Sequence, residues 1–423
     1  MARDCFVLAD APSALVELCG ISILERLLRM LQRCGVSRAT ILSATPDLIR
    51  QHLARPSWAR RGLQTIVRSR KEGGATLEEI VSLWPEGSNL LLWTRGDCVF
   101  DDRILKTLIS RNSAGVLVDS ASSVATRHCA AVLDREWIAR QKGPVEDALP
   151  QLPRVDVAEM PLYSPAVRRD LRPFWFYSPS PSRQLHAERV LLESVQKGTE
   201  DLPAYAHAPV ERFLLVRLCK MPVRPNQLTL LWAISAVITT ILFASGQLGI
   251  GILIALAVGI MDGLDGKLAR LKVETTEGGK LEHRLNSFFE VAWPFALALH
   301  FFRTGELRSA FWFWLILTIA QALDGIARGA IYRAAEKAMR PTNWLDQIVR
   351  LVGFRRNVFV WIMAIGILLD APAIAFVSAV WLQIATTIVD LGQVAWQRAV
   401  TKTPSSKAQA PKPLEARFSK FDR

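Results

Sequence analysis

Apolar residues follow two different patterns in the two halves of the chain. Up to about residue 140, short apolar runs at 5–9, 39–43 and 90–93 alternate with segments such as 22–34, in which apolar side chains recur at helical spacing. Short runs of this kind, bounded by turn residues, are typical of buried strands. The alternation predicts an α/β domain in which helices cover a parallel sheet.

Beyond residue 225 the apolar runs become much longer, and several approach the ~20 residues that a helix needs to cross the hydrocarbon core of a bilayer. Tryptophans flank the shorter runs, at depths that suit the membrane interface. The pattern predicts an all-α transmembrane domain of six helices, whose even number places both chain ends on one side. The expected helices lie at 227–246, 248–265, 285–302, 309–330, 355–371 and 373–394.

Composition divides the chain into four parts. We expect the α/β domain at 1–140, a connecting region at 141–224, the membrane domain at 225–400 and a disordered basic tail at 401–423. Within the connecting region, residues 210–221 mix apolar and basic side chains, which suits an amphipathic helix on the membrane surface. An ordinary linker helix fits that segment nearly as well.

Basic residues outnumber acidic ones, and the 423-residue chain has a formal net charge of +13. They cluster at one set of helix ends, whereas the short loops at the other ends contain only Arg303 and Arg308. By the positive-inside rule, both termini should be cytoplasmic. We therefore expect an integral membrane protein, of a bacterial inner membrane, that contacts membrane lipid and binds no nucleic acid.

The six cysteines all precede the membrane region and show no metal-binding spacing. Reduced thiols in a cytosolic domain account for them. The apolar run at the N-terminus is too short for a signal peptide, so the first domain should stay in the cytoplasm.

Acidic residues at the end of the second long apolar run are the strongest candidates for chemistry. Asp262 and Asp265 are three positions apart and share one helix face, while Glu282 and Asn286 share a face of the next helix. An acid inside an apolar segment is costly unless it faces a polar cavity, a partner or a metal ion. Two such faces could enclose divalent cations, and oxygen ligands favour Mg²⁺ or Mn²⁺ over zinc.

The motif at 262–270, D-G-L-D-G-K-L-A-R, resembles the first half of the CDP-alcohol phosphotransferase signature, D-x2-D-G-x2-A-R followed by G-x3-D-x3-D. Members of this family are membrane enzymes that move a substituted phosphate from a CDP-linked alcohol to an acceptor alcohol and release CMP. With Gly278 as the family glycine, the spacer is one residue shorter, and Glu282 and Asn286 stand where the third and fourth aspartates belong.

The resemblance implies roles for individual positions. In the family the fourth aspartate is the proposed general base, and the amide of Asn286 cannot accept a proton at neutral pH. Glu290, one turn further along the same face, is the candidate replacement. The other implied roles are metal ligation by Asp262, Asp265 and Glu282, space for the cytidine at Gly266 and Ala269, and a phosphate contact by Arg270.

Basic residues near the ends of later helices resemble the arginines that family members place near the acceptor's phosphate. Membrane topology alone would also put arginines there. The positions are Arg328, Tyr332, Arg333, Arg355 and Arg356.

Three functions stay open after this comparison. The first is an active transferase with a CDP-alcohol donor and an alcohol acceptor. Because membrane dimers are common in the family, the resemblance also makes a homodimer one possible arrangement. The second is a catalytically impaired relative, a pseudoenzyme, that binds a CDP-alcohol or scaffolds a lipid pathway. A transporter or purely structural protein comes last, because it would leave the motif unexplained.

The α/β domain resembles the sugar-phosphate nucleotidyltransferases. The segment 19–26 is similar to the start of their first helix, and Gly96-Asp97 to a strand end that binds a cation, although an acid in such a turn is commonplace. The loop at 9–14 lacks the glycines and the basic residue that cradle a triphosphate. We therefore expect a retained fold with a lost or altered site. The domain order resembles bifunctional enzymes that make CDP-inositol and condense it with inositol phosphate.

Overall fold

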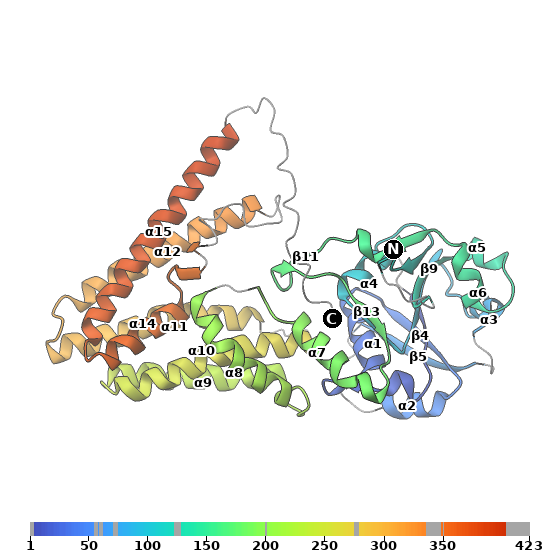
Figure 1. Cartoon of the computed structure of the whole chain (residues 1–423), viewed down its shortest axis with the longest axis horizontal. Coiled ribbons are helices and arrows are strands. Elements are labelled where there is room, and N and C mark those ends of the chain that lie inside the picture. The colour runs from blue at the N-terminus through green and yellow to red at the C-terminus, as the bar shows by residue number, and fades with distance from the viewer. Residues whose placement is uncertain are drawn as a thin grey trace.

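The computed structural model describes residues 4–54, 58, 62–70, 75–121, 128–198, 201–274, 279–335, 348–349 and 351–402, with the backbone alone at 279–283, 332–335 and 397–402. An α/β domain formed by the first part of the chain lies beside a group of long helices formed by the second part (Figure 1). The predicted fold class, an α/β domain followed by a helical domain, is confirmed.

One twisted sheet organises the α/β domain. Its described strands are β1 Asp4–Leu8, β4 Arg38–Ser43, β5 Gln64–Ser69, β6 Leu90–Arg95, β8 Gly115–Val118, β9 Ala130–Asp134 and β10 Arg154–Asp156. They lie in the order β10-β8-β9-β6-β1-β4-β5. Neighbours pair in parallel except for β9, which is antiparallel to both β6 and β8, so the sheet is mostly rather than wholly parallel.

Helices cover both faces of the sheet because successive residues of the buried central strand β1 point to opposite sides. Val7 packs into a cluster with α1 Ile23–Arg33, α2 Pro46–Leu53 and α4 Asp102–Ile109. Phe6 packs on the other face against α3 Leu77–Ser82, α5 Arg135–Ala139 and α6 Val145–Ala148. Such two-sided burial explains why the strands are continuous apolar runs.

Shorter elements extend this domain past residue 140, where the sequence analysis placed its end. Strand β10 joins the main sheet, and β13 Trp175–Tyr177 pairs with β7 Cys98–Phe100. The other short elements are β2 Glu17–Leu18, β3 Ile21–Ser22, β11 Tyr163–Ser164, β12 Arg169–Asp170, helix α7 Gln184–Ser194 and 3-10 turns at Ser13–Leu15, Leu149–Gln151, Val157–Glu159 and Pro181–Arg183.

The helical domain has a described helix at each of the six predicted places. Their bounds are α9 Pro225–Ala244, α10 Leu248–Leu271, α11 Gly279–Thr304, α12 Ala310–Ala335, α14 Arg356–Leu368 and α15 Pro372–Lys402. Within the described residues, four of them (α9, α10, α12 and α15) contain a stretch long and apolar enough to cross a membrane, and α14 is a shorter apolar helix. These helices support membrane insertion, while six crossings stay a prediction.

Helix α8, Leu202–Leu218, fills the connecting region and begins earlier than the predicted segment 210–221. One side of α8 is buried and includes His207, Glu211 and Leu215. Apolar side chains on its other side, among them Tyr205 and Phe213, are exposed. This division fits the predicted amphipathic helix, and its place on a membrane surface stays a prediction.

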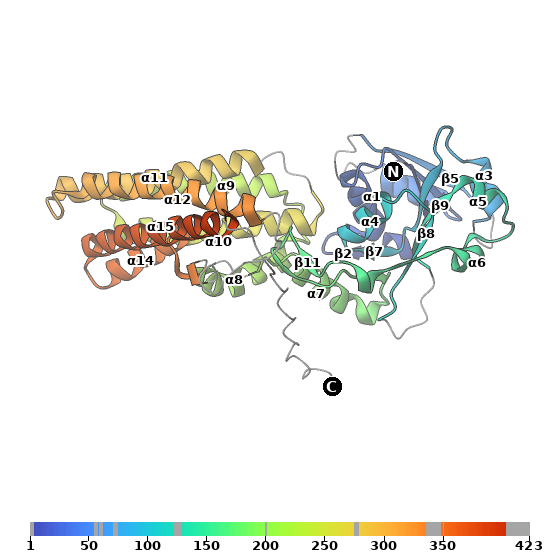
Figure 2. The ribbon, with the colours of Figure 1, turned by 90° about the horizontal axis from the view of Figure 1, so that it is seen from above.

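The two domains meet at the C-terminal end of α10, as the view from above also shows (Figure 2). Arg26 Nη1 donates to the carbonyl oxygen of Leu271 at 2.6 Å, and Arg29 Nη1 donates to that of Lys272 at 2.7 Å. Both arginines are buried residues of α1. The last carbonyls of a helix have no partners within it, so these arginines cap α10 from the other domain.

Candidate functional site

Small residues on α10 let two neighbouring helices approach closely. A Cβ atom at Gly263 would lie 2.5 Å from Oε1 of Glu211 on α8, and one at Gly259 would lie 3.0 Å from Oδ1 of Asn357 on α14. Glu211 also forms a buried ion pair with Lys267, one turn beyond Gly263. Helix α8 is thus fastened to the motif helix by close packing and by charge.

Asp262 is one of three side chains, from three helices, that form a closed ring of hydrogen bonds. Arg356 Nη2 of α14 donates to Asp262 Oδ2 at 2.8 Å, and Asn286 Nδ2 of α11 donates to Asp262 Oδ1 at 3.0 Å. Arg356 Nη1 donates to Asn286 Oδ1 and closes the ring. We call Asp262, Asn286 and Arg356 the triad. The structure therefore brings together two predicted site residues, Asp262 and Asn286, by a direct hydrogen bond and by a shared arginine.

Two tryptophans line the guanidinium group of Arg356. Its carbon atom Cζ lies 5.4 Å from the ring centroid of Trp232 and 5.8 Å from that of Trp293. Trp293 Nε1 donates to the carbonyl oxygen of Ala236 at 3.1 Å, which fixes the orientation of that ring. The Arg356 side chain is only 7% exposed. Indole faces attract cations, so the guanidinium is stabilised by the rings as well as by the triad.

Asp265 lies one turn from Asp262 and is buried. Its Oδ2 accepts a hydrogen bond from Thr229 Oγ1 of α9 at 2.9 Å, and its Oδ1 accepts one from the backbone nitrogen of Gly266 at 2.5 Å. A Cβ atom at Gly266 would lie 3.5 Å from Arg270 Nη1, so this guanidinium lies over the glycine. Asp265, Gly266 and Arg270 thus lie close together, and Ala269 is half-buried.

Glu282 and Glu290 are the other predicted site residues on α11. The side chain of Glu282 lies outside the described residues, and Glu290 is exposed on α11. Among the side chains that the structure describes, no group of three or more His, Cys, Asp and Glu residues is arranged to hold a metal ion.

The basic residues predicted near an acceptor phosphate have different surroundings. Arg328 contacts two carboxylates, Asp324 at 2.6 Å and Asp390 at 3.2 Å. The side chains of Tyr332 and Arg333 lie outside the described residues. Sequence reasoning considered Arg356 as an anion-binding residue and missed its pairing with Asp262. It also missed the contacts of Thr229, Trp232 and Trp293 with site residues, because nothing in the apolar runs marks which helix faces meet.

In the α/β domain, the predicted cation ligand Asp97 is also paired with an arginine. Arg95 Nε and Nη2 donate to the two oxygens of Asp97, each at 3.0 Å, and Arg95 Nη1 donates to Glu146 at 2.6 Å. Burial alone would lower the pKa of Arg95, but its hydrogen bonds and charge interactions with Asp97 and Glu146 raise that pKa above its usual value. In the altered loop, Asp10 accepts a hydrogen bond from Arg70 at 2.5 Å.

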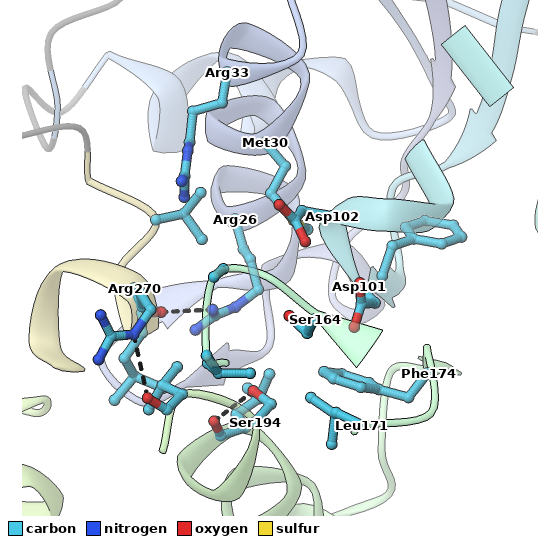
Figure 3. A pocket seen from close by; sticks show the side chains of 17 residues that line it. Arg26, Met30, Arg33, Asp101, Asp102, Ser164, Leu171, Phe174, Ser194 and Arg270 are labelled. Carbon is cyan, nitrogen blue, oxygen red and sulfur yellow. Dashed lines mark hydrogen bonds between the residues drawn. The ribbon is translucent and has the colours of Figure 1, made fainter. Parts of the chain in front are cut away.

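A cavity of about 100 Å³ lies where the domains meet (Figure 3). Arg26, Asp101 and Ser164 line it from the first domain, and Arg270 lines it from α10. Arg270 Nε donates to the carbonyl oxygen of Val195 at 3.2 Å, which ties the motif arginine to the end of α7. The triad residues are not part of its lining.

Residues 222–389 match the family model described as CDP-alcohol phosphatidyltransferase. The helical part of the chain is therefore a domain of this family, and it contains the motif helix and the triad. No curated protein matches the chain.

Solved structures similar to the α/β part include the inositol-1-phosphate CTP transferase from T. maritima, at 15% identity and a TM-score of 0.32, covering 43% of this chain and 91% of that one. HddC from Yersinia pseudotuberculosis is similar at 14% identity and a TM-score of 0.32, covering 44% of this chain and 98% of its own.

Proposed function

We propose that the membrane domain moves a substituted phosphate from a CDP-linked alcohol to an acceptor alcohol and releases CMP. The observation that carries this proposal is the complete first half of the motif on α10, within the residues that match the family. Asp265 and Arg270 flank Gly266, where a side chain would fill the space beneath the guanidinium. Small residues beside an arginine suit a nucleotide diphosphate, since arginine matches phosphate geometry.

In the proposed reaction, an oxygen of the acceptor hydroxyl attacks the phosphorus that bears the donor's alcohol. The bond from this phosphorus to the bridging oxygen breaks, and CMP leaves with the electron pair. Arg270 would offset the charge that develops on the phosphates. Glu290 is the proposed acceptor of the hydroxyl proton, because Asn286 is an amide.

The family resemblance also implies paired Mg²⁺ or Mn²⁺ ions, and the described residues do not fit such a pair. Both oxygens of Asp262 accept hydrogen bonds, one from Asn286 and one from Arg356, and the amide oxygen of Asn286 accepts a hydrogen bond from Arg356. Asp265 is the one motif carboxylate among the described side chains that lies outside the triad. Dependence on divalent cations is therefore a question for the assay below.

We further propose that the donor reaches the site from the cytoplasm, with both termini on that side of a bacterial inner membrane. The distribution of Lys and Arg supports this orientation. A reporter fused at Thr401 should be cytoplasmic and one at Gly246 should not. A non-cytoplasmic reporter at Thr401 would refute the orientation and leave the reaction untouched.

The experiment measures CMP release by the purified full-length protein from CDP-diacylglycerol and CDP-polyols, with several acceptor alcohols and a titration of Mg²⁺ and Mn²⁺. Wild type should release CMP, and Asp265→Ala should not. Glu306→Ala is the matched control, because Glu306 is exposed in a loop at the opposite helix ends, and it should behave as wild type. Full activity of Asp265→Ala would show that the site is wrong.

A second candidate function is a protein that binds a CDP-alcohol without turning it over. The observation that favours it is the hydrogen bond from Asn286 to Asp262, which uses two motif positions for structure. Cytidine nucleotide binding by wild type without CMP release, together with activity of Asn286→Asp, would support this candidate over the first.

A further inference from the structure

The triad satisfies Asp262 without a metal ion. A carboxylate inside a largely apolar helix needs a cation or hydrogen-bond donors. Here Oδ2 receives the Arg356 guanidinium at 2.8 Å and Oδ1 receives the Asn286 amide at 3.0 Å. The Asp262 side chain is 24% exposed and that of Arg356 only 7%, so the positive charge is the more deeply buried partner.

Asparagine is the residue type that closes this ring. Its amide nitrogen donates to Asp262 while its oxygen accepts from Arg356. An aspartate at the same position would set two negative oxygens about 3 Å apart, an arrangement that needs a cation or a proton between them. The departure from the motif at Asn286 and the presence of Arg356 are therefore complementary.

The surroundings of Arg356 suit a permanent charge. Trp232 and Trp293 present their rings to the guanidinium, and both are almost fully buried. Arginine keeps its proton at all physiological pH values, so the charge at this position does not depend on the supply of an ion.

An independent example of the same pairing occurs in the α/β domain. Asp97, the predicted cation ligand there, has both oxygens bound by Arg95 at 3.0 Å. The two aspartates lie in separate domains, and each is paired with an arginine.

We infer that Arg356 takes the place of a divalent cation at Asp262. In this half of the site, the positive charge is then supplied by a guanidinium of the protein itself and not by a bound ion. The inference rests on the proposed function, since it concerns the same site. It assigns to Arg356 a positioning role, in which it holds Asp262 and Asn286 together across α10, α11 and α14.

The test measures binding of Mn²⁺ to the purified full-length protein in detergent, by electron paramagnetic resonance of the free ion. In wild type, Asp262→Asn should change the Mn²⁺ affinity by less than twofold, because Asp262 does not bind the ion. The double variant Arg356→Gln, Asn286→Asp should gain a site that binds Mn²⁺ at least tenfold more tightly than wild type does. Adding Asp262→Asn to the double variant should remove this site. Arg308→Gln, an exposed arginine in a loop, is the matched control and should leave binding unchanged.

A second readout locates the gained site. Tb³⁺ bound where the guanidinium lies would be close to Trp232 and Trp293, so tryptophan excitation should sensitise its emission in the double variant and not in wild type. Replacing both tryptophans by phenylalanine should remove that emission.

Two results would overturn the inference. One is a wild-type Mn²⁺ site that Asp262→Asn abolishes, a comparison that does not depend on any change at Arg356. The other is a folded double variant, with wild-type thermal unfolding, that gains no Mn²⁺ binding. Because the readout is metal binding, a protein that shows the expected pattern but releases no CMP would refute the proposed function alone.

Discussion

Removing one partner of the buried pair of Lys267 and Glu211 should cost the helical domain more stability than removing one partner of an exposed ion pair. The two side chains are 11% and 9% exposed, and they join the motif helix α10 to α8. In Lys267→Met the apolar stem is kept and the charge is lost, so the carboxylate of Glu211 is left buried without its cation. Removing one partner of a buried pair costs about 3–5 kcal/mol.

The packing around Glu211 leaves its carboxylate little room to move toward solvent. Because a Cβ atom at Gly263 would lie 2.5 Å from Oε1, the carboxylate fits closely against α10. With roughly 2–4 °C per kcal/mol for a domain of this size, Lys267→Met should lower Tm by about 6–20 °C. Glu211→Leu combined with Lys267→Met should recover most of the loss, because no charge then stays unpaired.

The assay is thermal unfolding of the full-length protein in detergent, followed by circular dichroism. The matched control is Arg212→Met, since Arg212 pairs with Glu193 at 3.4 Å and both side chains are 57% exposed. An exposed pair contributes about 0–1 kcal/mol, so this variant should melt close to wild type. If Lys267→Met melts as wild type does, or the double variant is no more stable than the single one, the reasoning is wrong.

Three further predictions concern the α/β domain. Gly20→Ala should destabilise the protein by more than about 2 kcal/mol in thermal unfolding, because Gly20 has φ +80 and its Cβ would lie 2.1 Å from the carbonyl oxygen of Cys219. The control Gly35→Ala, at φ +85 with no neighbour within 4 Å, should lose only the free energy needed to hold alanine at a positive φ. Equal losses in the two variants would refute the role of the Cys219 contact. Burial raises the pKa of the Cys34 thiol to about 11, so its alkylation by iodoacetamide, followed by mass spectrometry, should keep rising about tenfold per pH unit from pH 8 to 10, and a plateau at pH 9 would contradict this. The full-length protein should release no pyrophosphate from CTP with sugar or polyol phosphates, because the altered loop has no phosphate cradle and Asp97 is bound by Arg95; robust metal-dependent release would show the reverse.

The local pattern of apolar residues predicted most helices and strands, but it could not predict which distant residues pair. Strands β1, β4 and β6 lie within two residues of the expected ranges, because each is defined by its own apolar run. The long helices overlap their expected ranges, and their ends differ from them by up to eight residues. Arg356 and Asp262 are 94 positions apart, and no periodicity specifies which helix faces meet. The antiparallel direction of β9 depends likewise on its partners β6 and β8.

One missed contact had a local signal. Arg95 and Asp97 are two positions apart at the end of a strand, and residues at that spacing point to the same side. An arginine so close to a predicted cation ligand could have indicated that the carboxylate already has a partner.

The contacts between α1 and the end of α10 constrain how the chain enters a membrane. The chain leaves the α/β domain, forms α9 and returns along α10, and Leu271 and Lys272 must arrive where Arg26 and Arg29 can reach their carbonyl oxygens. If both helices cross the bilayer, the turn at 245–247 must therefore lie on the side opposite the folded α/β domain. A hairpin inserted the other way would remove the hydrogen bonds that Arg26 and Arg29 donate to these two helix-end carbonyls. In that case the α/β domain, which is synthesised first, would favour the orientation of the first membrane hairpin that preserves these contacts.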